Sequence, residues 1–279
     1  MMSEQMAISG TEPVIEFDSV TLGFGGDPVL RDVSFELDPG ETKIVLGTAG
    51  AGKSVMLKLA MGLLEADAGA IRVLGQDITH LSEEELFPAR RNIGMVFQEG
   101  ALFDSLTIGE NVGYAFERMP EVSDDEAERR VRESLRFVEL EHTYDQFPSE
   151  LSGGMRRRVA IARAMVSRPP LLLYDSPTAG LDPITSQRII ALIIKQRDVH
   201  RVSSLLVTHR LQDAYYIASF RYDEATGRLV PIERNGTAHL GKGAARTRFL
   251  LLREGEIVFH GELNDLLASR DPYLQKFLA

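Results

Sequence analysis

The chain has 279 residues, with 31 lysines and arginines against 41 aspartates and glutamates, so its formal net charge is −10. Its 44% hydrophobic and 26% charged residues exclude collagen-like, wholly disordered and disulfide-stapled classes. Cysteine is absent, which excludes disulfides and thiolate metal sites. The sequence contains no run of 18 apolar residues, so no membrane span is predicted. Residues 1–13 are expected to form a flexible tail, and the acidic balance argues against broad nucleic-acid binding.

Alternating strands and helices are predicted over most of the chain. Strands are expected over 14–22, 29–37, 42–46, 71–74, 93–97, 171–174 and 204–207, and helices over 54–64, 153–167 and 185–198. The run Leu171–Tyr174 is apolar throughout, as is typical of a strand buried on both faces of a parallel sheet. This alternation predicts a layered α/β core.

The middle third breaks this alternation. Two capping boxes, Ser82 with Glu85 and Ser123 with Glu126, predict the starts of helices. The apolar residues of the second helix share one face, and they are Ala127, Val131, Leu135 and Val138. We therefore expect a separate helical lobe.

The last third departs from the pattern a second time. The stretch 222–248 contains four glycines, a proline and scattered charge, and is expected to be a surface insertion. Beyond it, strands over 249–252 and 256–259 are predicted to form a hairpin around Glu254 and Gly255, and a short helix is expected to follow.

A glycine-rich loop between strand 42–46 and helix 54–64 matches G-x-x-x-x-G-K-[ST]. Its residues are Gly47, Thr48, Ala49, Gly50, Ala51, Gly52, Lys53 and Ser54. Converging backbone N–H groups and a helix N-terminus bind phosphate, with Lys53 reaching the β- and γ-phosphates and Ser54 ligating Mg²⁺. A glycine turn with a chance lysine is the alternative, which the strand–loop–helix context disfavours.

A second ligand for Mg²⁺ is expected at the end of the buried strand, where ligand chemistry collects in α/β sheets. Asp175 follows Tyr174 directly and is the predicted carboxylate. An aspartate that only ends the strand in a turn is the alternative.

The order of these elements, followed through Leu151-Ser152-Gly153-Gly154-Met155, resembles the ATP-binding-cassette (ABC) ATPases from about residue 14 to 278. The resemblance implies an α/β fold. It consists of a P-loop NTPase core with an antiparallel β subdomain and a helical subdomain at about 100–158. It also implies ATP and Mg²⁺ as cofactors and ATP hydrolysis as the activity.

Further residues take roles from this resemblance. Phe24 would stack on adenine, Gln98 would touch Mg²⁺ and the attacking water, and His209 would contact the γ-phosphate. Asp182 ends the stretch that crosses between subunits. The serine and glycines of the 151–155 element are expected to meet the γ-phosphate held by a second subunit; they are Ser152, Gly153 and Gly154. A homodimer of nucleotide-binding subunits is therefore expected. The arginines at 156–158 are expected on exposed faces of the following helix.

Two positions depart from the family pattern. Met155 replaces the usual glutamine, and this change is expected to be tolerated because the neighbouring serine and glycines make the phosphate contacts. Ser176 replaces the usual glutamate that polarises the attacking water, and serine cannot act as a general base at neutral pH. His209 or Gln98 could position the water instead, the partner subunit could supply catalysis, or the residue could have been altered to trap the ATP-bound state. Our hypothesis is slow but real hydrolysis.

The stretches 97–112 and 271–278 are similar to ATPases of the Mce/Mla type. That resemblance implies phospholipid transport across the bacterial envelope, with a membrane permease and an Mce-type lipid-binding protein as partners and a peripheral place on the cytoplasmic face of the cell membrane. Asp104, Ser105 and Leu106 would then lie near the groove for the permease. The alternative for these three is packing of the helical lobe.

Three other functions remain open at this stage. The ATPase of an amino-acid or other nutrient importer is one, and an ATP-clamped switch with little turnover, motivated by Ser176, is another. A non-transport ABC protein of DNA repair or translation is disfavoured, because tandem cassettes and a long coiled coil are absent.

Overall fold

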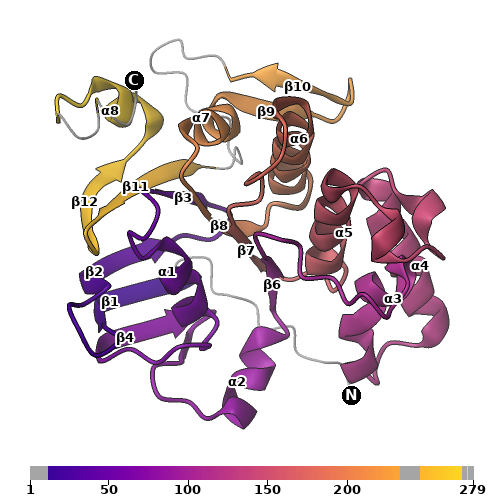
Figure 1. The fold of residues 1–279 in the computed structure, drawn as a ribbon, viewed down its shortest axis with the longest axis horizontal. Helices are drawn as coiled ribbons and strands as arrows, with labels where there is room; N and C mark the ends of the chain where they lie inside the picture. Colours follow the sequence, from indigo (N-terminus) through magenta and orange to yellow (C-terminus); the bar gives the residue numbers. More distant parts are fainter. Residues whose placement is uncertain (1–11, 233–245, 272–274, 276–279) are drawn as a thin grey trace.

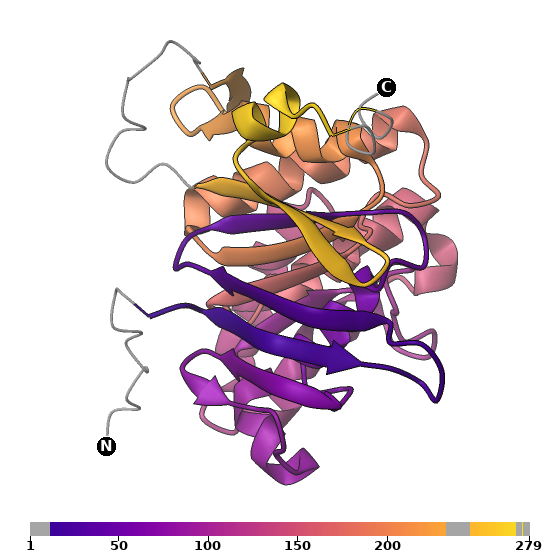
Figure 2. The same cartoon turned by 90° about the vertical axis from the view of Figure 1, so that its left-hand side faces the viewer.

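The computed structural model describes residues 12–232, 246–271 and 275. In the ribbon, helices cover one face of a central sheet and a second sheet lies on its other side (Figures 1 and 2). Most of the predicted N-terminal tail lies outside the described residues, as do 233–245 of the predicted insertion. Of the C-terminal stretch that resembles the Mce/Mla type, only residues 271 and 275 are described.

Six strands form the central sheet in the order β12-β11-β3-β8-β7-β6. Their bounds are β3 Thr42–Leu46, β6 Ile93–Val96, β7 Leu171–Asp175, β8 Ser203–Thr208, β11 Thr247–Arg253 and β12 Glu256–Gly261. The five neighbours from β11 to β6 run parallel, and β12 pairs antiparallel with β11 as the predicted hairpin. The predicted parallel sheet is confirmed, with strand ends shifted by one or two residues.

Alternate residues of the central strands face two separate apolar cores. In β7, Leu171 and Leu173 belong to one core, whereas Leu172 and Tyr174 belong to the other. All four side chains are buried. The continuous apolar run therefore reflects burial on both faces, as predicted.

The first core lies between the central sheet and an antiparallel sheet in the order β2-β1-β4-β5. The strands are β1 Ile15–Leu22, β2 Leu30–Leu37, β4 Ala68–Val73 and β5 Gln76–Asp77. Helix α1 (Lys53–Ala60) contacts β4 of the second sheet and β7 and β8 of the first. Its apolar residues join the two sheets, so the loop that precedes α1 is held by both.

The second core lies on the opposite face of the sheet and collects most of the helices (Figure 1). They are α3 Ile108–Gly113, α4 Asp124–Phe137, α5 Gly153–Met165, α6 Pro183–His200 and α7 Leu211–Ser219, with 3-10 turns η1 Tyr114–Arg118, η2 Glu141–Thr143 and η3 Pro148–Glu150. The predicted apolar face of α4 packs into this core. The middle third is therefore helical, as predicted, and shares its core with α5 and α6.

One of the two predicted capping boxes forms. Ser82 and Glu85 bond reciprocally at the start of α2 (Glu83–Arg90). At the start of α4, Ser123 accepts a hydrogen bond from the Glu126 N–H at 3.4 Å. The second half of this box was predicted wrongly, because the Glu126 carboxylate binds arginines of the next turn instead.

The first part of the predicted insertion forms a hairpin of β9 (Phe220–Asp223) and β10 (Arg228–Pro231). Lys195 of α6 places its Nζ 5.7 Å from the Tyr222 ring centroid, so the hairpin packs on α6. Beyond β12, α8 (Leu263–Ala268) is the short helix predicted near the end. Within the described ranges, no helix is long and apolar enough to cross a bilayer.

Candidate functional site

Four parallel strands bring their carboxyl ends to one edge of the central sheet. Leu46 pairs with Thr208, and Val96 pairs with Tyr174, so the loops after β3, β6, β7 and β8 leave the sheet together. Residues that are far apart in the sequence therefore meet here: the glycine-rich loop, Gln98, Asp175 with Ser176, and His209. This is the edge where open α/β sheets bind ligands.

Two glycines of the loop are required by close contacts. A Cβ at Gly47 would lie 2.5 Å from the Leu252 carbonyl oxygen, and one at Gly52 would lie 2.7 Å from Leu30 Cδ2. Gly52 also has φ of 99°, in the left-handed region that favours glycine. As the N-cap of α1 it has no side chain to bond the first N–H groups, which leaves them to an anion.

Lys53 starts α1 with its side chain folded back into the loop. Its Nζ donates to the carbonyl oxygens of Gly47 at 2.9 Å and Thr48 at 2.7 Å. Burial lowers the pKa of Lys53, and the charge of Asp175 opposes that shift. The ammonium group therefore sits in the loop as a buried cation facing a carboxylate.

Asp175 ends β7 with one carboxylate oxygen that has no protein partner. Its Oδ1 is buried and accepts no hydrogen bond from the described residues. Such an orphaned carboxylate oxygen is costly in a protein interior unless a ligand satisfies it. Together with the Ser54 hydroxyl at the start of α1, this oxygen fits a Mg²⁺ ion, which takes few protein oxygens and completes its shell with phosphates and water. No group of three metal-binding side chains occurs among the described residues.

The three predicted catalytic residues differ in exposure. Ser176 is 8% exposed, has φ of 45°, and donates its N–H to the Val207 carbonyl at 2.9 Å. Gln98 and His209 are exposed after β6 and β8. The edge thus places a short buried hydroxyl where a general base is expected, flanked by two exposed polar side chains.

Phe24 and Asp182 belong to segments other than the glycine-rich loop. Phe24, between β1 and β2, is 63% exposed, so its ring is open to a stacking partner. Asp182 caps α6 by accepting from the N–H groups of Ile184 and Thr185, both at 3.0 Å. Hydrogen bonds from Thr185 lower the pKa of Asp182. The role of Asp182 in this structure is therefore a helix cap, and its nucleotide contact stays a prediction.

The Ser152-Gly153-Gly154 element starts α5, on the opposite face of the sheet from α1. Ser152 caps the helix by accepting from the Met155 N–H at 3.2 Å. A Cβ at Gly154 would lie 2.4 Å from Thr185 Cγ2, so glycine is needed where α5 approaches α6. Within one chain, this helix start and the glycine-rich loop belong to opposite sides of the central sheet.

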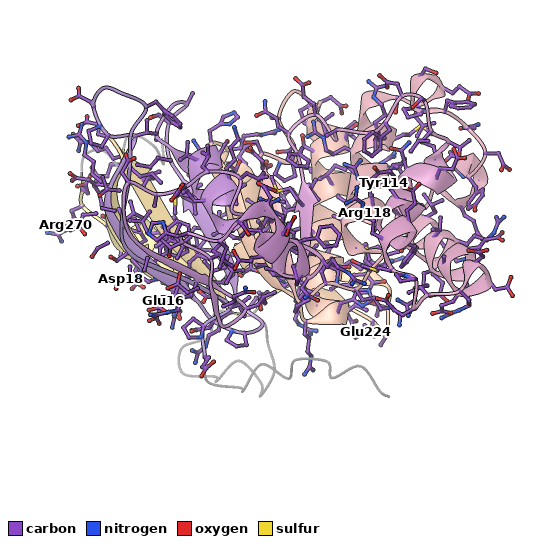
Figure 3. All side chains as sticks on the ribbon, turned by 90° about the horizontal axis from the view of Figure 1, so that it is seen from below. Glu16, Asp18, Tyr114, Arg118, Glu224 and Arg270 are labelled. Carbon is purple, nitrogen blue, oxygen red and sulfur yellow. The ribbon has the colours of Figure 1, made fainter. Side chains whose placement is uncertain are left out.

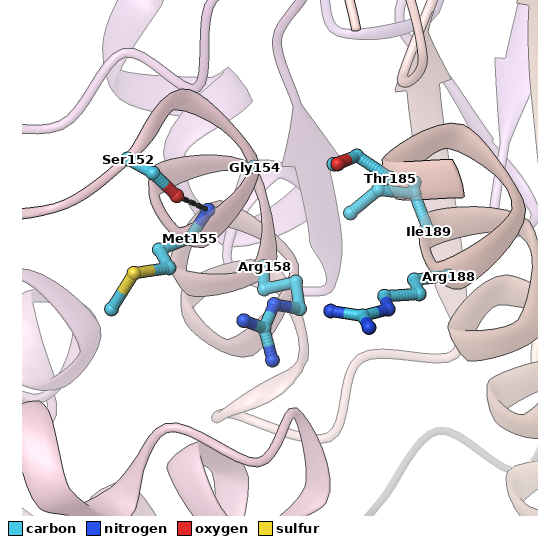
Figure 4. Close-up of a pocket in the computed structure, with 7 residues that line it drawn as sticks. All are labelled: Ser152, Gly154, Met155, Arg158, Thr185, Arg188 and Ile189. Carbon is cyan, nitrogen blue, oxygen red and sulfur yellow. Dashed lines mark hydrogen bonds between the residues drawn. The ribbon is translucent and has the colours of Figure 1, made fainter. Parts of the chain in front are cut away.

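A small pocket of about 70 Å³ opens beside that helix start. It is lined by residues of α5 and α6 and by the cap of α5: Ser152, Gly154, Met155, Arg158, Thr185, Arg188 and Ile189 (Figure 4). The guanidinium groups of Arg158 and Arg188 point toward the same space (Figure 4). Burial lowers the pKa of Arg158, and the charge of Arg188 adds to that shift, whereas Glu139 opposes it. The surface around Ser152 is therefore suited to a negatively charged group.

The prediction that the arginines at 156–158 lie on exposed faces was wrong. Arg157 is 6% exposed and donates to the carbonyl oxygens of Phe97 at 3.1 Å and Ala179 at 3.4 Å. The other two also bond backbone carbonyl groups, at Leu151 and Val138. Helical spacing could have revealed this, because Arg157 shares a face with the buried Ala160, Ile161 and Ala164.

The stretch Asp104, Ser105 and Leu106 leads into α3 on the surface of the helical region. Asn111, fully buried, holds it through hydrogen bonds that include the Phe103 N–H at 2.7 Å and the Leu106 carbonyl at 3.0 Å. Phe103 and Tyr114, next to this stretch, are exposed aromatic residues, and so is Phe87 of α2. Phe103 and Tyr114 pack at 4.6 Å, and Arg118 covers Phe87 at 5.5 Å. Figure 3 shows Tyr114 and Arg118 close together on the helical side.

Comparison with known proteins identifies a family model and several relatives. Residues 30–179 match the family described as "ABC transporter". The chain is 36% identical over 285 residues to Protein TRIGALACTOSYLDIACYLGLYCEROL 3, chloroplastic, of Arabidopsis thaliana, covering 99% of this chain and 76% of that protein. It is 37% identical over 227 residues to the methionine import ATP-binding protein MetN of Bifidobacterium longum, covering 79% and 56%.

A third relative is the probable ribonucleotide transport ATP-binding protein mkl of Mycobacterium leprae, 36% identical over 200 residues, covering 72% of this chain and 56% of that protein. The chain thus spans little more than half the length of the MetN and mkl proteins. Among solved structures, the ATP-binding cassette MJ0796 bound to ADP and Pi superposes with a TM-score of 0.72 at 29% identity, covering 89% and 98%. CbiO1 from Clostridium perfringens, at 23% identity with a TM-score of 0.75, covers 96% and 95% and shares the fold.

Proposed function

The chain belongs to the family of ABC transporter ATP-binding proteins, and from this premise we propose that it is the ATP-hydrolysing subunit of a transporter that moves phospholipid across the bacterial envelope. The observation that carries the nucleotide part is the orphaned Asp175 Oδ1 beside buried Lys53 and the uncapped start of α1. A carboxylate, an ammonium group and free N–H groups together suit a nucleotide polyphosphate with Mg²⁺.

Each residue at the edge then has a physical task. Gly47 to Gly52 present N–H groups to phosphate oxygens, Lys53 exchanges its carbonyl partners for the β- and γ-phosphates, and Ser54 with Asp175 holds the cation. Bound Mg²⁺ neutralises charge on the phosphates. Phe24, which is open to solvent, supplies a face for the adenine ring.

A second nucleotide-binding subunit completes the site in this proposal. Ser152, Gly153 and Gly154 lie across the sheet from the chain's own glycine-rich loop, and the pocket beside them holds two convergent guanidinium groups. An anionic ligand bound by one copy would meet these groups in the other. Two ATP molecules would therefore join two copies, and loss of the γ-phosphate would weaken the joint.

Hydrolysis is proposed to be slow because Ser176 provides no general base. Its hydroxyl is short and buried, so water must be oriented by the exposed Gln98 and His209 at the same edge. An ATP-clamped switch without turnover is the competing proposal, and Ser176 is the observation that favours it. Steady-state phosphate release by the assembled transporter separates the two: turnover above that of Lys53→Met supports the ATPase, and equal rates support the switch.

The lipid assignment rests on the similarity of residues 97–112 to the Mce/Mla type and on the relative named for trigalactosyldiacylglycerol. The MetN relatives favour a methionine importer as the second candidate. In either case we propose that a membrane permease docks at the surface formed by Asp104–Leu106 and the neighbouring Phe103 and Tyr114. For the lipid assignment, an Mce-type lipid-binding protein is the further partner.

One experiment tests the cargo. The chain is co-purified with the permease it binds, and the complex is reconstituted in vesicles that hold either fluorescent phospholipid or labelled methionine. Nucleotide-dependent movement of phospholipid, absent with Lys53→Met, is the expected result. Movement of methionine alone would overturn the lipid assignment and support the importer, while failure to bind any permease would overturn both.

A further inference from the structure

Arg157 joins two loops that meet at the candidate site. It projects from the first turns of α5 and is nearly fully buried. One end of its guanidinium donates to the Phe97 carbonyl at 3.1 Å, directly before Gln98. The other end donates at 3.4 Å to the carbonyl of Ala179, the first residue of the stretch that ends in Asp182. One side chain therefore touches the backbone of both loops.

The chemistry of the guanidinium suits this place. Its planar fork carries several donors in fixed directions, so it can bond two carbonyl groups that belong to different segments. Burial lowers the pKa of Arg157, whereas the charges of Glu99 and Asp175 oppose that shift. The buried cation is thus placed between two loops and within reach of the carboxylate at the end of β7.

A second arginine of α5 provides a comparison. Arg163 donates to the carbonyl oxygens of Gly100 at 2.8 Å and Ala101 at 2.7 Å. It therefore bonds the loop after β6, and among the described residues none of its hydrogen bonds reaches the loop after β7. Arg157 bonds both, which separates its role from that of its neighbour on the same helix.

We propose that Arg157 is a positioning residue that ties the Gln98 loop and the Ala179–Asp182 loop to α5. Both loops would then move together with the first turns of this helix. The start of α5 carries Ser152, which in the proposed function meets the nucleotide of the second subunit. Binding of that nucleotide at Ser152 would then set the positions of Gln98 and of the loop after β7 together. The link between the two loops and α5 rests on the two hydrogen bonds of Arg157. Its effect on ATP turnover rests on the proposed function.

Amide hydrogen exchange of the full chain tests the geometry without any turnover. In Arg157→Met, peptides covering 97–101 and 177–182 are expected to exchange at least about tenfold faster than in the parent, because both loops lose a fixed donor. In Arg163→Met, only the 97–101 peptide should exchange faster. Unchanged exchange of 177–182 in Arg157→Met would overturn the inference. If that variant does not fold, Arg157→Gln, which keeps a shorter neutral donor, is read in the same way.

Kinetics of the assembled transporter test the consequence. Arg157→Met is expected to lower kcat at least about tenfold with KM for ATP unchanged, since the glycine-rich loop is untouched. Arg157→Lys keeps the charge but not the fork, so it should not restore kcat fully. Arg168→Met, an exposed arginine beyond the end of α5, is the control expected to match the parent. A parallel rise in KM would overturn the positioning role, whereas a parent without turnover contradicts the proposed hydrolysis and leaves the exchange experiment decisive.

Discussion

Replacing Ser176 by glutamate should raise ATP turnover strongly. Ser176 is 8% exposed, its N–H is fixed to the Val207 carbonyl at 2.9 Å, and it follows Asp175 with its unpaired oxygen. A glutamate would extend a carboxylate from this fixed backbone into the same edge of the sheet. General bases contribute about 10²- to 10⁴-fold, or about 3 to 5 kcal/mol of barrier, and we expect an increase in kcat within that range.

The assay is phosphate release by the purified transporter at saturating ATP. Ser176→Gln is the matched control, because it has the same length and burial without the negative charge, and it should stay within about threefold of the parent. The difference between the two variants isolates the carboxylate from changes in packing. Equal rates for Ser176→Glu and Ser176→Gln would refute the argument that the missing base limits turnover.

Other residues give sharp expectations. Lys53→Met should abolish measurable ATP binding in a fluorescent-nucleotide titration, and binding by the parent should weaken as the pH rises toward 10.5, since burial lowers the pKa of Lys53 from that ordinary value and the neutral amine attracts phosphate poorly. Between the lowered pKa of folded Lys53 and 10.5, the unfolded chain holds more protons than the folded chain. The Lys53 contribution to the free energy of unfolding therefore rises with pH over this range, as denaturation at several pH values would show. Lys43 and Glu41, 3.3 Å apart and each 1% exposed, form a buried pair. Lys43→Met should lower the free energy of unfolding, measured by urea denaturation, by about 3 to 5 kcal/mol, and by much less when it is combined with Glu41→Gln. Gly154→Ala should cost about 1 to 3 kcal/mol through its clash with Thr185 Cγ2, and adding Thr185→Ser should recover most of the loss; no recovery would contradict the contact.

Local patterns predicted the parts of the site that depend on neighbours in the sequence. The motif from Gly47 to Ser54 runs from the end of β3 into the first turn of α1 as expected, because glycine conformations and the strand–helix transition are set by short-range sterics. The run Leu171–Tyr174 was also predictable, since a strand buried on both faces must be apolar at every position.

Errors arose where side chains had a choice of partner. At the start of α4, the Glu126 carboxylate binds Arg129 and Arg130 and not the Ser123 N–H that a capping box requires. A capping-box pattern cannot weigh that competition, because both options lie within one helical turn. The arginines of α5 were placed in solvent by their charge, although their spacing puts Arg157 on the buried face.

The sequence by itself determined the family, the glycine-rich loop and the carboxylate that faces it, because these depend on short motifs and on their order. Only the tertiary structure decided how the loops relate to α5. Phe97 and Ala179 have no common pattern in the chain, yet both accept hydrogen bonds from Arg157. That juxtaposition follows from parallel strands that end at one edge, which depends on long-range pairing and not on any local preference.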